Sequence, residues 1–117
     1  MFNYVAGKKL TVYVESAETW QGGPLYSAIV RRCWDHGIAG ATVIRCEEGY
    51  GGRHVHHAAR LWSLNDDLPV RVEIIETADR FPKVLEALAG MLGKGLTIVD
   101  DVQVVKEVPD EPGAAGS

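Results

Sequence analysis

Two successive strand–helix–strand units restrict the fold of this chain more than any other feature of its sequence. Apolar residues alternate over 8–15, an apolar stripe with helical spacing begins at Pro24, and a β-rich run occupies 41–46. The same order returns from 70–76, where a strand is followed by a second helical stripe and a last β-rich run. This is the element order of the split βαβ sandwich, so the sequence predicts an α+β, ferredoxin-like βαββαβ fold.

Start and stop signals flank both predicted helices. Pro24 suits the first turn of the first helix, and Gly37 is placed to end that helix in the left-handed conformation. Asp79 is expected to cap the second helix, and Gly93 is expected to end it.

The C-terminal part of the chain divides into a strand and a tail. We expect the strand in two pieces, 96–99 and 102–105, bent where two acidic residues interrupt the apolar alternation. Residues 109–117 are rich in Pro, Gly and Ala and are expected to be disordered. One domain over 1–108 accounts for the rest, as the length of 117 residues suggests.

Charge and hydropathy exclude several classes of function. The chain has 12 Lys and Arg against 16 Asp and Glu, and it lacks the basic run that would bind a nucleic-acid backbone. No window is long and apolar enough to span a bilayer, and the first residues lack the apolar core of a signal peptide. We therefore expect a cytoplasmic protein that does not bind nucleic acid.

The stretch from Gly37 to Gly51 carries the clearest functional signal. It begins Gly-Ile-Ala-Gly-Ala-Thr-Val and closes on Gly49-Tyr50-Gly51. Glycines spaced in this way permit sharp turns and let the backbone approach a ligand closely. Residues 47–68 form the one long irregular stretch of the predicted domain, and a loop of that length is usually either functional or disordered.

This pattern resembles the PII-like signalling proteins, whose motif is Gly-x-x-Gly-x-Thr-Val, then a strand, then Gly-aromatic-Gly. The resemblance is closest to one bacterial and archaeal branch that is described as a domain of unknown function. The shared segments are Lys-Leu-Thr-Val-Tyr at 9–13, Gly-x-Pro-Leu-Tyr at 22–26, Leu-Pro-Val-x-Val-Glu at 68–73 and Asp-Val-x-Val-Val at 101–105. They span nearly the whole chain.

Proteins of this superfamily are trimers that bind adenine nucleotides between subunits, so the resemblance implies a homotrimer with a nucleotide ligand. By the same resemblance, the residues that contact the nucleotide are Gly40, Ala41, Thr42, Gly49, Gly51, Gly93, Lys94 and Gly95. Lys94 would place a point charge on a phosphate oxygen. The alternative is that these glycines only shape turns.

The sequence favours a ligand with few phosphate groups. The well-studied nucleotide sensors of the superfamily carry a pair of arginines on or after the last strand, whereas residues 104–107 here read Val-Val-Lys-Glu. A single cation beside an acid neutralises a triphosphate poorly. We therefore expect AMP or ADP as the ligand rather than ATP.

The long loop contains a cationic, histidine-rich segment, which we interpret as the contact surface for a partner. Its residues are Arg53, His54, His56, His57 and Arg60. In this superfamily the partner is often a membrane transporter, a channel or a metabolic enzyme. A weaker alternative is a metal site at His54 and His56, in a trimer that resembles the divalent-cation-tolerance proteins.

The sequence contains no convincing catalytic constellation. It has neither a Gly-x-Ser-x-Gly elbow nor a Gly-x-x-x-x-Gly-Lys-Ser/Thr phosphate loop. Acylphosphatases share the predicted topology, but they need an arginine after the first strand, and residues 16–23 contain none. We predict a regulatory protein with no cofactor, and a small enzyme of unknown reaction is the remaining alternative.

One face of the predicted sheet is expected to lie away from the helices. Thr11, Tyr13, Arg71 and Ile75 alternate with the helix-facing residues of their strands, so they should share this second face. Their mixed character suits subunit contact, and we expect a trimer with its three sheets facing inward.

Overall fold

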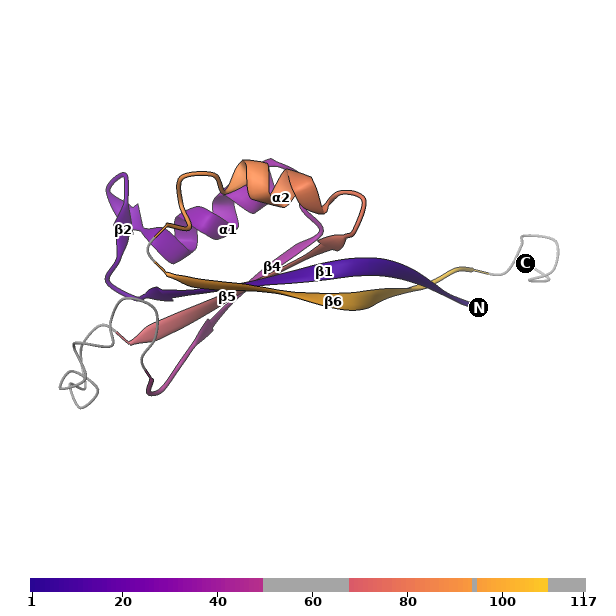
Figure 1. The fold of residues 1–117 in the computed structure, drawn as a ribbon, viewed down its shortest axis with the longest axis horizontal. Coiled ribbons are helices and arrows are strands. Elements are labelled where there is room, and N and C mark those ends of the chain that lie inside the picture. The colour runs from indigo at the N-terminus through magenta and orange to yellow at the C-terminus, as the bar shows by residue number, and fades with distance from the viewer. Residues whose placement is uncertain (50–67, 94, 110–117) are drawn as a thin grey trace.

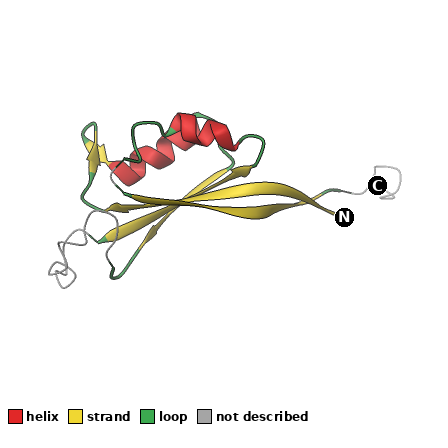
Figure 2. Cartoon of the chain, in the orientation of Figure 1, coloured by secondary structure: helices red, strands yellow, loops and turns green. Residues whose placement is uncertain are grey.

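The protein folds as a four-stranded antiparallel sheet with two helices on one face (Figures 1 and 2). The computed structural model describes residues 1–49, 68–93 and 95–109. Its main elements are β1 (Phe2–Glu15), α1 (Leu25–Asp35), β4 (Gly40–Arg45), β5 (Pro69–Thr77), α2 (Phe81–Ala87) and β6 (Leu96–Glu107). The strand order is β4-β5-β1-β6, so the predicted α+β, ferredoxin-like sandwich is confirmed.

The core lies between the helices and the even-numbered side chains of the two central strands. Leu10, Val12 and Val14 on β1 face the helices, and all three are at most 6% exposed. The β5 side chains in the same layer are Val70, Val72 and Ile74, and the main helix residues that cover them are Leu25, Ile29, Cys33, Phe81 and Val84. These residues occupy alternate positions because side chains of a strand point to opposite faces in turn.

The opposite surface of the sheet, here called the open face, is not covered by either helix. Tyr13 pairs with Arg71, Thr11 with Glu73 and Lys9 with Ile75, so these odd-numbered residues lie on it together. The register adds Gly40, Thr42 and Ile44 from β4 and Leu96 and Ile98 from β6. The predicted placement of Thr11, Tyr13, Arg71 and Ile75 on one face is therefore confirmed.

Strands β1 and β6 extend beyond the rest of the sheet (Figure 1). The pairing of β1 with β5 ends at Gly7, opposite Thr77, whereas its pairing with β6 continues to Phe2, opposite Glu107. Residues 2–6 and 103–107 therefore form a projecting two-stranded ribbon. Its exposed apolar side chains include Phe2, Tyr4 and Val105. Such a ribbon is marginally stable in water by itself.

The last strand is continuous, and the predicted bend at Asp100-Asp101 is wrong. Asp100 lies opposite Lys9, and Asp101 lies opposite Lys8, with 2.6 Å between the Lys8 Nζ and the Asp101 Oδ1. A lysine therefore faces each acid across the ladder, and opposite charges in such positions support pairing. The local sequence of β6 contains no sign of these cross-strand partners.

The start and end of the second helix also differ from the prediction. Arg80 rather than Asp79 occupies the N-cap position, where it makes no side-chain capping bond, and α2 ends at Ala87, well before Gly93. Pro82 lies in the first turn, where its missing N–H costs nothing and its fixed φ suits the helix. A proline in that position favours a helix start one residue before it.

The segment between β1 and α1 contains a small hairpin of two short strands, β2 (Thr19–Trp20) and β3 (Gly23–Pro24). Gln21 and Gly22 connect them with φ of 47° and 90°, the positive values that a type I′ turn requires. Trp20 packs against the core, which supports a packing role for its ring. Within the described ranges, neither helix is long and apolar enough to cross a membrane.

Candidate functional site

The turn between α1 and β4 forms one wall of the candidate site, and Gly37 determines its shape. Gly37 has a φ of +68°, as expected for a left-handed helix cap. Its N–H donates to the Trp34 carbonyl, and the Ile38 N–H donates to the Cys33 carbonyl. This pair of bonds is the Schellman motif, in which the residue after the glycine packs on the core, as Ile38 does. The predicted role of Gly37 is thus confirmed.

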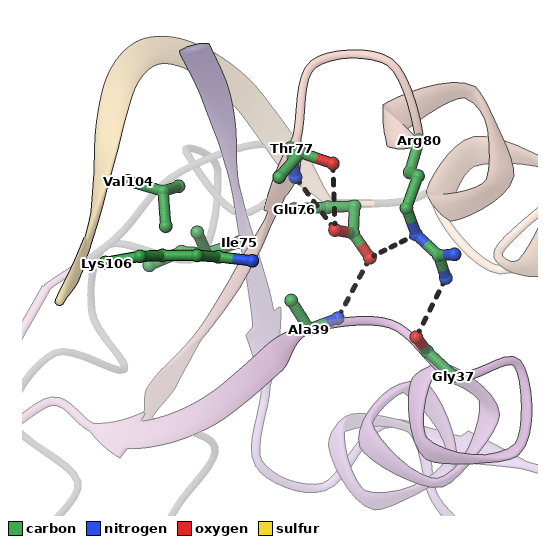
Figure 3. Close-up of a pocket in the computed structure, with 8 residues that line it drawn as sticks. All are labelled: Gly37, Ala39, Ile75, Glu76, Thr77, Arg80, Val104 and Lys106. Atoms are coloured by element: carbon green, nitrogen blue, oxygen red, sulfur yellow. Dashed lines mark hydrogen bonds and ion pairs between the residues drawn. The ribbon is translucent and has the colours of Figure 1, made fainter. Parts of the chain in front are cut away.

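A cavity of about 270 Å³ opens beside this turn (Figure 3). The lining residues come from the turn, the end of β5, the start of α2 and the ribbon, and they are Gly37, Ala39, Ile75, Glu76, Thr77, Arg80, Val104 and Lys106. The Lys106 side chain crosses one side of the cavity, and the Arg80 guanidinium lies on the other. Ile75 and Val104 lie beside the Lys106 side chain, and Ala39 lies between the two cations.

Gly7 allows β6 to reach this cavity across β1. A Cβ at Gly7 would lie 2.8 Å from the Val104 Cγ2, closer than real side chains pack, and 3.1 Å from the Glu76 carbonyl oxygen, which is tighter than most such contacts. Without that side chain, Val104 on β6 approaches the end of β5 although β1 runs between the two strands. Gly7 is one of the positions where a close approach of chain segments requires glycine.

Glu76 lies at the base of the cavity and is 3% exposed. Its Oε2 accepts a hydrogen bond from the Ala39 N–H at 3.0 Å and lies 3.3 Å from the Arg80 Nε, while its Oε1 accepts from the Thr77 N–H at 2.8 Å. Arg80 also donates from Nη2 to the Gly37 carbonyl at 3.0 Å. The carboxylate thus joins β5, α2 and the turn before β4.

These bonds decide the charge state of Glu76. Burial alone would raise its pKa, but the N–H groups of Thr77 and Ala39 and the Arg80 guanidinium together hold the pKa below its ordinary value of 4.5. Glu76 is therefore ionised at neutral pH and partnered by Arg80. With Lys106, the ionised groups that line the cavity carry a formal charge of +1.

The first group of predicted contact residues adjoins this cavity. Gly40 pairs with Ile75, and both lie on the open face together with Thr42, which is exposed. A Cβ at Gly40 would meet no atom within 4 Å, so the space in front of this glycine is free. The side chain of Ala41 lies in the helix-facing layer opposite Ile74, so only its backbone is available to a ligand.

The second group lies at the other end of the sheet. A Cβ at Gly49 would lie 3.6 Å from Pro69 and one at Gly95 only 2.2 Å from the Tyr13 carbonyl oxygen, whereas Gly93 is exposed. Ile75 lies six positions along β5 from Pro69, which is roughly 20 Å along a strand. Among the residues that the structure describes, a single chain therefore does not bring Gly49 close to Gly40.

Several predicted residues lie outside the described part of the chain. These are Gly51 and Lys94 from the nucleotide set, and Arg53, His54, His56, His57 and Arg60 from the loop. Among the residues that the structure does describe, no group of three His, Cys, Asp or Glu could hold a metal ion. The thiol of Cys33 is buried, which raises its pKa to about 11, so it stays protonated at neutral pH.

Glu76 and Arg80 are the residues that the sequence analysis missed. Position 76 continues the even-numbered, core-facing series of β5, so a glutamate there would face the protein interior. A charged residue at a core-facing position is almost never buried unless it has a partner. That conflict between charge and register is the sequence signal that could have identified Glu76 as a buried residue with a partner.

The family model described as "DUF190: Uncharacterized ACR, COG1993" matches residues 7–104. That range contains every strand pairing of the four-stranded sheet except those of the ribbon. The chain belongs to this family.

Two relatives support the assignment. A UPF0166 protein of Aquifex aeolicus is 34% identical over 86% of this chain and 95% of its own length. The UPF0166 protein MJ1524 of Methanocaldococcus jannaschii is 30% identical, over 87% of this chain and 94% of its own length.

Solved structures show the same fold in PII-like proteins. CPII of Thiomonas intermedia K12, a nitrogen regulatory PII-like protein bound to ADP, AMP and bicarbonate, has a TM-score of 0.61 and 16% identity, covering 91% of this chain and all of its own. A putative PII-like signaling protein of Thermus thermophilus, TTHA0516, has a TM-score of 0.57 and 21% identity, covering 87% of this chain and 92% of its own. This DUF190 chain therefore has the PII-like fold.

Proposed function

We propose that this DUF190 protein is a cytoplasmic PII-like regulator that binds an adenine mono- or diphosphate between neighbouring subunits of a homotrimer. The observation that carries the proposal is the division of the predicted contact residues between opposite ends of the sheet. Gly40 follows Ala39, which lines the cavity, and pairs with Ile75, whereas Gly49 lies beside Pro69, roughly 20 Å along β5, and Gly95 lies beside Tyr13. A site that needs both ends requires a second copy of the chain.

The cavity itself favours a ligand with few phosphates. Its formal charge of +1 comes from Lys106, because Arg80 is already paired with Glu76. Stabilisation of each further phosphate charge would need another cation nearby. A solved protein of the same fold, CPII, binds ADP and AMP, which agrees with this preference.

Calorimetric titration of the purified protein with AMP, ADP and ATP tests the ligand. We expect heat and a single class of sites for AMP or ADP, with weaker binding of ATP. A thermal-shift series with the same nucleotides and with Zn²⁺ and Cu²⁺ serves as an independent arm, because a ligand specific for the folded state raises stability by mass action. Stabilisation by a metal and not by any nucleotide would replace this proposal with the divalent-cation alternative.

The proposed route from ligand to partner is the loop over 47–68. Its segment from Arg53 to Arg60 is basic and histidine-rich, so it suits an acidic surface on a transporter or enzyme. Hydrogen exchange on the protein with and without saturating AMP tests this assignment. We expect exchange to change within this loop, and identical exchange there in both samples would remove the loop from the signalling route.

A further inference from the structure

Glu76 is the one charged residue that is buried among those the structure describes. A buried carboxylate is costly unless donors satisfy it, and here they come from three places in the chain. Thr77 donates from the adjoining backbone, Ala39 from the turn before β4, and Arg80 from the start of α2. All these bonds converge on one side of the cavity (Figure 3).

The carboxylate is thus engaged with the protein and is not presented to a ligand. Oε2 receives both the Ala39 N–H and the Arg80 guanidinium, and Oε1 receives the Thr77 N–H. A catalytic base or a metal ligand would instead keep an oxygen directed at open space. What Glu76 does in this arrangement is hold other groups in place.

Arg80 extends this hold to a second point of the turn. Its Nε lies against Glu76, and its Nη2 donates to the Gly37 carbonyl. The turn is therefore fastened at Gly37 through Arg80 and at Ala39 through Glu76. Ala39 is solvent-exposed, so without Glu76 its N–H would be free to bond with water.

We propose that Glu76 and Arg80 form a clamp that positions the α1–β4 turn and, through it, the wall of the nucleotide site at Gly40. The clamp is a positioning device that makes no bond to the ligand through its carboxylate. The effect that we expect on ligand binding rests on the proposed function. The fixed position of the turn rests only on the bonds just described.

Three substitutions test the contributions of Glu76 and Arg80 to the clamp separately. Glu76→Gln keeps the size of the side chain but replaces one accepting oxygen with an NH₂ group, which faces donors. Arg80→Met removes both bonds of the guanidinium. Arg80→Lys keeps the charge, but a single ammonium group lacks the planar fork that reaches Glu76 and Gly37 at once. Lys83→Met is the matched control, because Lys83 is an exposed cation on α2 that does not line the cavity.

Amide exchange measured by NMR tests the fixed turn without any ligand. We expect the Ala39 N–H to exchange at least about tenfold faster in Glu76→Gln and Arg80→Met than in the wild type, with core amides of β1 unchanged. Lys83→Met should behave as the wild type. Unchanged exchange at Ala39 in the clamp variants would overturn the inference. If Glu76→Gln fails to fold, the Arg80 variants decide the same point.

Calorimetry with AMP then tests the consequence. In Arg80→Met and Glu76→Gln we expect binding weakened by about tenfold or more, with partial rescue in Arg80→Lys and none of the loss in Lys83→Met. Faster exchange at Ala39 with wild-type affinity would show that the clamp does not position the site, and would overturn the proposal. Absence of binding in the wild type itself would instead reject the nucleotide function and leave the exchange result to decide the clamp.

Discussion

Gly40 occupies a position where the fold tolerates a side chain and the proposed ligand does not. A Cβ there meets no atom within 4 Å, and the residue does not have a positive φ. We expect Gly40→Val to change the free energy of unfolding by no more than about 0.5 kcal/mol. It should weaken AMP binding by about a hundredfold, since the valine occupies the space in front of β4. Calorimetry that finds wild-type affinity in the folded variant would contradict this placement of the site.

Gly95 is the opposite case, because here the chain itself excludes a side chain. A Cβ would lie 2.2 Å from the backbone oxygen of Tyr13, so Gly95→Ala must displace a strand. We expect a loss of about 3 kcal/mol in the free energy of unfolding, measured by urea denaturation. Gly93→Ala is the control two residues away, where a Cβ meets nothing within 4 Å. Equal stability of the two variants would show that the close contact at Tyr13 is not present in solution.

At the scale of elements, Glu76 ties the end of β5 to its neighbours in a way that depends on pH. Its pKa in the folded protein lies below 4.5, so its contribution to stability is present above that value and is lost as pH falls through the lowered pKa. We expect Glu76→Gln to be less stable than the wild type by roughly 1–3 kcal/mol at pH 7. This difference in the free energy of unfolding should become smaller in acid, because Glu76 becomes protonated in the wild type.

Urea denaturation of both proteins from pH 7 to pH 3 measures this difference. Glu86→Gln, at an exposed position of α2, should show almost no difference from the wild type at any pH. If the difference in free energy of unfolding between the wild type and Glu76→Gln stays constant down to pH 3, the lost stability does not come from the ionised carboxylate.

The elements themselves were largely predictable, because local patterns determine them. The alternation of Leu10, Val12 and Val14 identifies a half-buried strand, and Gly37 ends α1 as its position predicts. Two of the features that were misplaced or missed depend on partners outside the strand concerned. Asp101 belongs inside a strand because Lys8 faces it. Likewise, Glu76 is stable in the interior because Ala39 and Arg80 meet it there, and the alternation of β5 shows that position 76 faces inward without identifying these partners.

For the whole molecule, both the uncovered open face and the proposed nucleotide site favour an assembly of several copies of the chain. The face has a mixed composition, with Ile98 43% exposed and Ile75 37% exposed beside an Arg71–Glu73 ion pair of 3.1 Å. In the proposed site, another subunit supplies the end of the sheet that Gly40 does not reach. The sequence indicated the predicted contact residues through a family resemblance, and it could not show that Gly40 and Gly49 lie far apart in one chain.

We expect a trimer in multi-angle light scattering at micromolar concentration, with the open faces inward. Ile98→Glu should yield monomers, because it would bury a charge without a partner in the interface. Leu85→Glu is the control, since Leu85 is 46% exposed on α2, on the other side of the sheet. A wild-type monomer, or dissociation caused by Leu85→Glu and not by Ile98→Glu, would contradict this arrangement.

The ribbon of β1 and β6 has two sides with different neighbours. Lys106 and Val104 point to one side and line the cavity, whereas Val105, between them in sequence, lies opposite Tyr4 on the other side. Both Tyr4 and Val105 are more than half exposed. A molecule bound to this aromatic and aliphatic pair would therefore contact the strand that carries the cavity's lysine from the side away from the cavity. The ribbon thus offers an outer contact surface whose residues alternate along the strand with those of the pocket.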